Sequence, residues 1–221
     1  MAIEGCDVSH HNGLLNYKAI FNAGVRFVFI KATDGAFNTD NMFVKNWQAA
    51  TSAGLLAGAY HFFRPLNDPV KQADFFLKTI ASRKGLPPVV DLEWSPRRGI
   101  KDEWSLVKGG QPVIPVRQRV EIIAQYLQRI ESKIGRKPII YTATSWWNPT
   151  LNNAKTCGQV NFGDYSLWIA YYPKKRPLVL PAPWKNYLIH QYSGSGNIAG
   201  FHPIDRNQFN GTLDILQALS T

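Results

Sequence analysis

Two acidic residues, Asp91 and Glu93, stand two positions apart at the end of a short apolar run that begins at Val89. Side chains at positions i and i+2 of a β-strand leave the same face, so both carboxyl groups are expected to face one space. Neighbouring negative charges repel, and the usual result is that one pKa rises until that group keeps its proton near neutral pH. We expect the charge of Asp91 to raise the pKa of Glu93.

A neutral acid beside an ionised carboxylate is the equipment of glycoside hydrolysis. The simpler alternative for Asp91 and Glu93 is a solvated pair on an exposed strand edge, because structural ion pairs also perturb pKa values. The rest of the chain has to decide between the two interpretations.

Polar or ionisable side chains also follow the other predicted strands, at the position where each apolar run ends. They are Asp7, Asp34, His61, Tyr141, Tyr171, Gln191 and Asp205. In a barrel of parallel strands the chemistry lies at the carboxyl ends of the strands. The pattern therefore predicts one shared site.

The elements that must position these residues alternate along the first two thirds of the chain. Strands are predicted at 3–6, 25–31, 55–60, 86–90 and 138–141, and helices at 17–23, 41–53, 68–82 and 116–134. Gly24 and Gly54 follow the first two helices as stop signals. Successive β-α units predict a parallel sheet with right-handed crossovers.

The last third changes character. Strands are predicted at 167–170, 187–190 and 200–204, but the stretches between them are short, rich in Pro and Gly, and poorly helical. We therefore predict an α/β fold: an irregular TIM-like barrel with five β-α units followed by three strands that lack full helices. One catalytic domain is expected to span residues 1–221.

Composition narrows the classes of partner. The 221 residues are 45% hydrophobic, and no run of 18 apolar residues offers a membrane span. The first residues lack the basic and apolar regions of a signal peptide, so we expect either a mature form or export by other machinery. Two cysteines do not make a disulfide framework.

The formal charge of +10 implies attraction to a polyanion. The basic residues are scattered in short groups, such as 83–84 and 97–98, and no nucleic-acid-binding motif accompanies them. We therefore expect no nucleic acid partner. The bacterial cell wall is the other common polyanion, and the basic segment 174–176 is predicted to be a solvated loop.

Eight short motifs occur along the chain in the order found in one enzyme family. They are GCDVS at 5–9, FVFIKATDG at 27–35, GAYHF at 58–62, VDLE at 90–93, IYT at 140–142, LWIAY at 167–171, HQY at 190–192 and IDRNQFNG at 204–211. In these motifs the chain resembles the family 25 glycoside hydrolases, lysozyme-like N-acetylmuramidases. They cut the β-1,4 bond between N-acetylmuramic acid and N-acetylglucosamine in peptidoglycan.

The resemblance implies catalytic roles for four carboxyl groups. Glu93 corresponds to the general acid, and Asp91 to a nucleophile or to the group that orients the acetamido oxygen of the substrate. Asp7 and Asp205 correspond to the other two site carboxylates. Either role of Asp91 retains the configuration of the sugar. Asp91 and Glu93, as same-face strand neighbours roughly 6 to 7 Å apart at Cα, fit a retaining enzyme better than an inverting one.

Two residues depart from the family pattern. Asp34 stands where Glu is common, and Cys6 where an aliphatic residue is usual; neither belongs to the acid pair. Substrate contacts are expected from Asp34, His61 and Gln191, and from mouth aromatics that can stack on sugars, namely Tyr60, Tyr141, Trp168 and Tyr171. In the insertion 95–115, Trp104 is either a sugar platform or a packing residue.

We expect a peptidoglycan hydrolase that acts as a monomer, outside the cytoplasm, without membrane insertion. No metal or cofactor is expected, because His10, His11 and His61 lack a recognised ligand spacing. Two other functions stay open: a non-catalytic barrel that only binds wall glycan, and a hydrolase of another N-acetylated glycan such as chitin.

Overall fold

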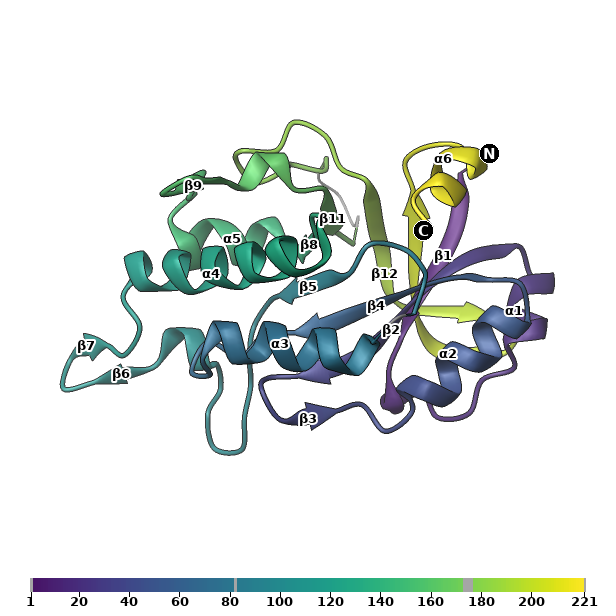
Figure 1. Ribbon diagram of the computed structural model, residues 1–221, viewed down its shortest axis with the longest axis horizontal. Helices are drawn as coiled ribbons and strands as arrows, with labels where there is room; N and C mark the ends of the chain where they lie inside the picture. Colours follow the sequence, from purple (N-terminus) through teal and green to yellow (C-terminus); the bar gives the residue numbers. More distant parts are fainter. Residues whose placement is uncertain (1, 82, 173–176, 221) are drawn as a thin grey trace.

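Eight strands form a closed barrel within the part of the chain that the computed structural model describes, residues 2–81, 83–172 and 177–220. Their order is β1-β13-β12-β11-β8-β5-β4-β2, and β1 pairs with β2 to close the ring (Figure 1). The strands are β1 Ile3–Val8, β2 Val25–Asp34, β4 Leu56–Phe62, β5 Val89–Leu92, β8 Ile139–Thr142, β11 Leu167–Ala170, β12 Ile189–Ile198 and β13 Phe201–Phe209. Residue 82, the predicted end of the third helix, and the predicted basic loop 174–176 lie outside these ranges.

A helix follows each of the first five barrel strands. These helices are α1 Tyr17–Asn22, α2 Phe43–Ser52, α3 Pro69–Ile80, α4 Val116–Ile134 and α5 Thr144–Leu151. No helix separates β11, β12 and β13 in the described residues, and α6, Leu213–Ala218, follows β13. The predicted irregular TIM-like barrel, with five β-α units and then three strands, is confirmed.

The last strand corrects the expectation of a parallel sheet. β13 runs antiparallel to both neighbours, β12 and β1. Asp205 therefore lies inside β13, opposite Asp7, and not at a strand exit as the sequence suggests. It reaches the carboxyl ends of the parallel strands because β13 enters the barrel from that side.

The core has two parts, because successive residues of a barrel strand face opposite sides. Phe27 and Phe29 of β2 pack inside the barrel, whereas Val28 and Ile30 pack against the surrounding helices. A side chain at Gly5 would overlap the ring of Phe27, so the absence of a Cβ there lets that ring fill the interior. Side chains fill much of the barrel interior and leave a cavity at one end of it.

Short strands and 3-10 turns lie in the connections between the barrel strands and the helices. They are β3 Asn38–Thr39, β6 Val107–Lys108, β7 Gln111–Pro112, β9 Thr156–Cys157, β10 Val160–Asn161 and the 3-10 turns η1 His10–Asn12, η2 Glu103–Ser105 and η3 Phe162–Asp164. The β6–β7 hairpin belongs to the insertion after β5 and projects away from the barrel (Figure 1). Among the described residues, no helix has the length and apolarity that crossing a bilayer requires.

Candidate active site

A cavity of about 80 Å³ opens at the carboxyl ends of the parallel strands. Its lining contains four carboxylic acids, three aromatic rings, an amide and an aliphatic side chain. The lining residues are Asp7, Tyr60, Val89, Asp91, Glu93, Tyr141, Trp168, Gln191 and Asp205. The structure thus brings together the four carboxyl groups that the sequence singles out, along with four of the seven predicted substrate contacts.

The strand period explains how the acids meet. Val89, Asp91 and Glu93 are alternate residues along β5 and its exit, and all three line the cavity. Asp7 comes from β1 and Asp205 from the facing position of β13. Three strands that are far apart in the sequence therefore supply one acidic site.

Two side-chain amides donate hydrogen bonds to the carboxyl group of Asp7. Its Oδ2 accepts hydrogen bonds from Gln191 Nε2 and Asn207 Nδ2, each at 2.8 Å. Asn207 is oriented in turn by Trp168, whose Nε1 donates to Asn207 Oδ1 at 2.9 Å. Although burial raises the pKa of Asp7, the hydrogen bonds from Asn207 and Gln191 oppose that rise.

Two residues of this network escape the sequence analysis. Asn207 lies two positions after Asp205 on the same strand, so strand alternation alone could have placed it on the same face. The hydroxyl of Tyr172 donates to Gln191 Oε1 at 2.6 Å. The hydroxyl of Tyr141 donates to the same oxygen at 2.8 Å. Tyr172 carries no comparable signal, because it lies beyond the end of β11.

The pKa values of all four acids are raised, with burial as the first cause in each case. Burial and the charge of Glu93 raise the pKa of Asp91 well above its ordinary value. Burial and the charge of Asp7 raise the pKa of Glu93 to about 7. The pKa of Asp205 rises to about 8 through burial, the charge of Asp7 and a hydrogen bond with Asp7. The cavity can therefore hold a transferable proton at neutral pH.

The repulsion between Asp91 and Glu93 that the sequence predicts is present in the structure, where it raises the pKa of Asp91. Burial and the charge of Asp7 are the main causes of the raised pKa of Glu93. Burial is the larger cause for Asp91, whose Oδ1 has no hydrogen-bond partner among the described residues. Asp7, with its two amide donors, is the better stabilised anion.

His61 does not reach the cavity. It follows Tyr60 on β4, and adjacent strand residues face opposite sides, so Tyr60 faces inward and His61 faces the helices. Its ring is fully buried, with Nδ1 2.7 Å from Thr33 Oγ1 and Nε2 3.2 Å from Gln72 Oε1. Burial lowers the pKa of His61 to about 3. The predicted substrate contact by His61 is replaced by a packing role.

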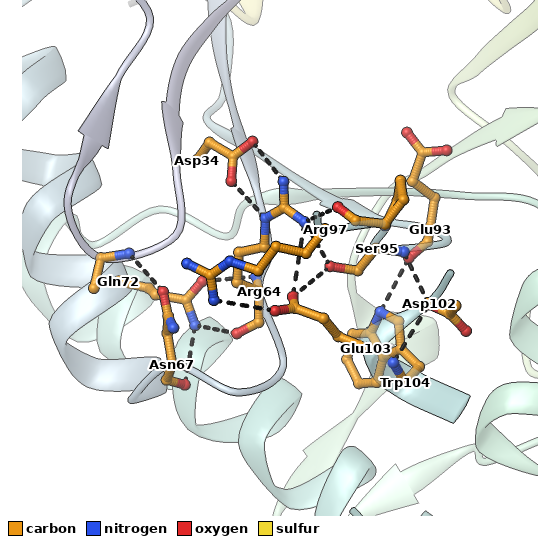
Figure 2. Close-up of polar contacts among 12 residues, drawn as sticks. Asp34, Arg64, Asn67, Gln72, Glu93, Ser95, Arg97, Asp102, Glu103 and Trp104 are labelled. Carbon is orange, nitrogen blue, oxygen red and sulfur yellow. Dashed lines mark hydrogen bonds and ion pairs between the residues drawn. The ribbon is translucent and has the colours of Figure 1, made fainter. Parts of the chain in front are cut away.

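Asp34 lies in a separate hollow of about 300 Å³ beside the cavity, together with Lys31 and Arg64. Arg64 donates to both Asp34 oxygens, at 2.6 and 3.1 Å (Figure 2). Lys31 Nζ lies 3.0 Å from Asp34 Oδ2. Although burial opposes it, the hydrogen bond and charge of these cations lower the pKa of Asp34. Its carboxylate is engaged within the protein rather than directed at the cavity.

Tyr171 and Trp104 also lie outside the cavity. Tyr171 lines a hollow beside α5, and its backbone carbonyl accepts a hydrogen bond from His190 Nε2 at 2.8 Å. Trp104 is only 1% exposed, which excludes an exposed sugar platform. Its indole Nε1 donates to the backbone carbonyl of Glu93 at 3.0 Å. Of the two interpretations of Trp104, packing is the correct one.

Known proteins resemble the chain over nearly its whole length. The family model described as glycosyl hydrolases family 25 matches residues 6–201. A bacterial lysozyme from Streptomyces coelicolor is 30% identical, with a TM-score of 0.86, and the match covers 100% of this chain and 97% of the other. A family 25 lysozyme from Aspergillus fumigatus is 31% identical, with a TM-score of 0.82 and full coverage of both chains.

Curated relatives point the same way. Lysozyme M1 of Streptomyces globisporus is 32% identical over 99% of this chain and 71% of its own length. The N,O-diacetylmuramidase of Chalaropsis sp. is 28% identical over 99% of both chains. The match to the family model covers most of the barrel and includes three of the four cavity acids, Asp7, Asp91 and Glu93. Asp205 lies four residues beyond the matched range. The chain therefore belongs to glycosyl hydrolase family 25 and is a glycoside hydrolase.

Proposed function

We propose that the chain is a muramidase that hydrolyses the β-1,4 bond between N-acetylmuramic acid and N-acetylglucosamine in peptidoglycan, with retention of configuration. The observation that carries the proposal is the cluster of Asp7, Asp91, Glu93 and Asp205 around one cavity, with the pKa of Glu93 at about 7. The names of the relatives, a lysozyme and an N,O-diacetylmuramidase, support the substrate class.

Glu93 acts as the general acid in this proposal. Its carboxyl proton passes to the glycosidic oxygen as the bond from that oxygen to the anomeric carbon breaks. A pKa near 7 keeps a large share of Glu93 protonated at neutral pH while leaving the proton acidic enough to transfer. In the second step, the Glu93 carboxylate takes a proton from the water that attacks the anomeric carbon.

Asp91 has to be ionised in this proposal, and protonation of Glu93 favours that state, because the charge of Glu93 is, after burial, a cause of the raised pKa of Asp91. Its Oδ1 is buried and has no hydrogen-bond partner among the described residues, although Asp91 lines the cavity. An oxygen placed in this way is available either to attack the anomeric carbon or to orient the acetamido group of the substrate for that attack. Both routes give retention, and both place Asp91 on the face opposite the leaving group.

Asp7 supplies negative potential to the same space, while Asp205, whose pKa is about 8, shares a hydrogen bond with it. The transition state of glycoside hydrolysis resembles an oxocarbenium ion and carries positive charge at the sugar ring. A preorganised anion such as Asp7, fixed by Gln191 and Asn207, stabilises that charge without reorganisation. Tyr60, Tyr141 and Trp168 form apolar parts of the cavity wall against which the sugar ring packs.

Digestion of purified peptidoglycan tests the function. The products are reduced with borohydride and analysed by mass spectrometry, and a muramidase yields reduced N-acetylmuramic acid at the new ends. Reduced N-acetylglucosamine would indicate a different bond specificity, and the absence of new ends would favour the glycan-binding alternative. NMR of the fresh products identifies the anomer that is released first, and the β-anomer would establish retention. Chitin oligosaccharides serve as the competing substrate.

The proposal extends to the setting of the enzyme. Residues 1–221 act as one catalytic domain on the bacterial cell wall, and the protein works as a monomer without a cofactor. The formal charge of +10 favours approach to an anionic wall.

A further inference from the structure

The backbone of Glu93 lies just beyond the barrel. β5 ends at Leu92, and its pairing with β8 also ends there, at Thr142. Catalysis depends on placement within fractions of an ångström, so a residue past the last strand pairing needs another means of support. The insertion after β5 provides one.

Three residues of the insertion bind the chain directly after β5. Trp104 Nε1 donates to the carbonyl of Glu93 at 3.0 Å. The backbone N–H of Ser95 donates to Asp102 Oδ1 at 2.9 Å, and the N–H of Glu103 donates to the carbonyl of Ser95 at 2.9 Å. These bonds fix residues 93–95 from one side. In Figure 2 the carboxyl group of Glu93 points away from Trp104, which contacts only its backbone.

A buried carboxylate fastens the insertion to the barrel. Glu103 is fully buried and accepts a hydrogen bond from Ser95 Oγ at 2.8 Å. Arg97 and Arg64 approach its two oxygens at 3.2 and 3.7 Å. Arg64 is held at the same time by both oxygens of Asp34, so the chain of charges runs from β2 to the insertion (Figure 2). Such a buried ion is stable only when it is paired in this way.

The indole of Trp104 cannot turn freely. It stacks on Phe63 with ring centroids 5.8 Å apart and meets the edge of Trp146 at 5.1 Å. The donor Nε1–H is therefore aimed by packing before any substrate arrives.

We propose that Trp104 is a positioning residue for the general acid, and that the Asp34–Arg64–Glu103 network keeps it in place. Trp104 touches no reacting atom in this role; it fixes the carbonyl of Glu93 and thereby the direction from which the carboxyl group enters the cavity. Asp34 acts from outside the cavity through Arg64, which accounts for its position away from the other acids. The inference rests on the proposed role of Glu93.

The chain supplies a matched pair of variants. Trp104→Phe keeps an aromatic ring in the core but removes the N–H that reaches Glu93. Trp147 is also fully buried, and within the described residues its Nε1 has no hydrogen-bond partner. Its ring packs on Phe162 and Trp184 rather than on Trp104. Trp147→Phe therefore removes the same atoms from another buried position without removing a hydrogen bond. The comparison separates lost packing from lost positioning.

Both variants are assayed on solubilised, uncross-linked peptidoglycan, with kcat, KM, the pH profile and the melting temperature recorded. We expect similar losses in melting temperature, a kcat lower by roughly tenfold for Trp104→Phe only, and KM within about twofold of wild type for both. Equal kcat values for the two variants would overturn the inference. A wild-type protein that releases no reducing ends would instead refute the proposed function.

A second variant covers the case in which Trp104→Phe does not fold. Ser95→Ala removes the hydroxyl that joins the exit of β5 to Glu103, at little cost in volume. A several-fold lower kcat at unchanged KM is expected, because Trp104 and the Glu93 carbonyl then move relative to each other. An unchanged kcat in a folded Ser95→Ala protein would contradict the positioning role.

Discussion

Asp205 lies directly opposite Asp7 in the antiparallel pairing of β13 with β1, and the two carboxyl groups share a hydrogen bond. Burial and the charge of Asp7 raise the pKa of Asp205 to about 8. An Asp in an unfolded chain ionises near pH 4, so the folded protein keeps a proton that the unfolded chain releases. The stability that Asp205 contributes is complete below about pH 4 and is lost as the pH rises through about 8.

The Asp205→Asn variant should therefore be more stable than wild type at alkaline pH. The amide stays neutral and still donates a hydrogen bond to Asp7, so we expect a higher melting temperature at pH 9 and little difference at pH 4. Glu121→Gln removes the same charge from the surface of α4, where Glu121 pairs with Arg117, and is the control. Calorimetry at both pH values decides; a gain of equal size at pH 4 and pH 9 would argue against the linkage.

Glu93→Gln should fold and lose nearly all hydrolysis. The substitution keeps the shape of the side chain and removes the transferable proton, and general acid catalysis is worth roughly 10²- to 10⁴-fold. Release of reducing ends from peptidoglycan measures the loss, and circular dichroism checks the fold. Activity within about tenfold of wild type would exclude Glu93 as the general acid.

Asp7→Asn should shift the titration of Glu93 to lower pH. The charge of Asp7 is, after burial, a cause of the pKa of about 7, and removing a neighbouring negative charge makes Glu93 easier to ionise. The alkaline limb of activity, where Glu93 loses its proton, then moves down in pH.

Carbon-13 NMR of the Glu93 carboxyl group measures this shift even if Asp7→Asn turns over slowly. Asp91→Asn is the comparison, because it removes the other carboxyl group that repels Glu93. If neither variant moved the titration, burial alone would set the pKa of Glu93.

Binding to the wall should weaken steeply with salt. The charge of +10 acts over distances that salt screens, so sedimentation of Glu93→Gln with purified peptidoglycan should fall between low salt and roughly 0.5 M. The inactive variant avoids digestion during the assay. Equal pelleting at both salt concentrations would assign binding to exposed aromatic rings instead, such as Phe37, Trp94 and Tyr172, which are 77%, 47% and 48% exposed.

The regular part of the fold is predictable because its periodicity is strong. The predicted bounds of the helix 116–134 agree with α4, and the predicted strand 167–170 agrees with β11. The elements whose bounds the sequence does not predict, α5 and the β12–β13 hairpin, have weak local signals. α5 contains Pro149 and has no side-chain cap, and the β12–β13 hairpin is rich in Gly and Ser, with register shifts along its length.

The site is predictable where one strand determines the geometry. Asp91 and Glu93 share a face because the strand period is two, and the same rule separates Tyr60 from His61 once the strand is known to extend to Phe62. Trp104 is different, because its environment is made by Phe63 and Trp146, which no local pattern connects to it. The catalytic roles of the four acids stay predictions until variants are assayed.

Closure of the barrel through β1 has a consequence for the time at which activity arises. Asp7 depends on a hydrogen bond from Asn207, a residue 200 positions later in the chain. Contacts between such distant residues form late, because the entropy of closing the intervening loop must be overcome first. During synthesis, the first strand emerges from the ribosome long before its final partner does. A nascent chain that stops before β13 has no completed acid cluster, so the hydrolase becomes competent only after β13 has been made.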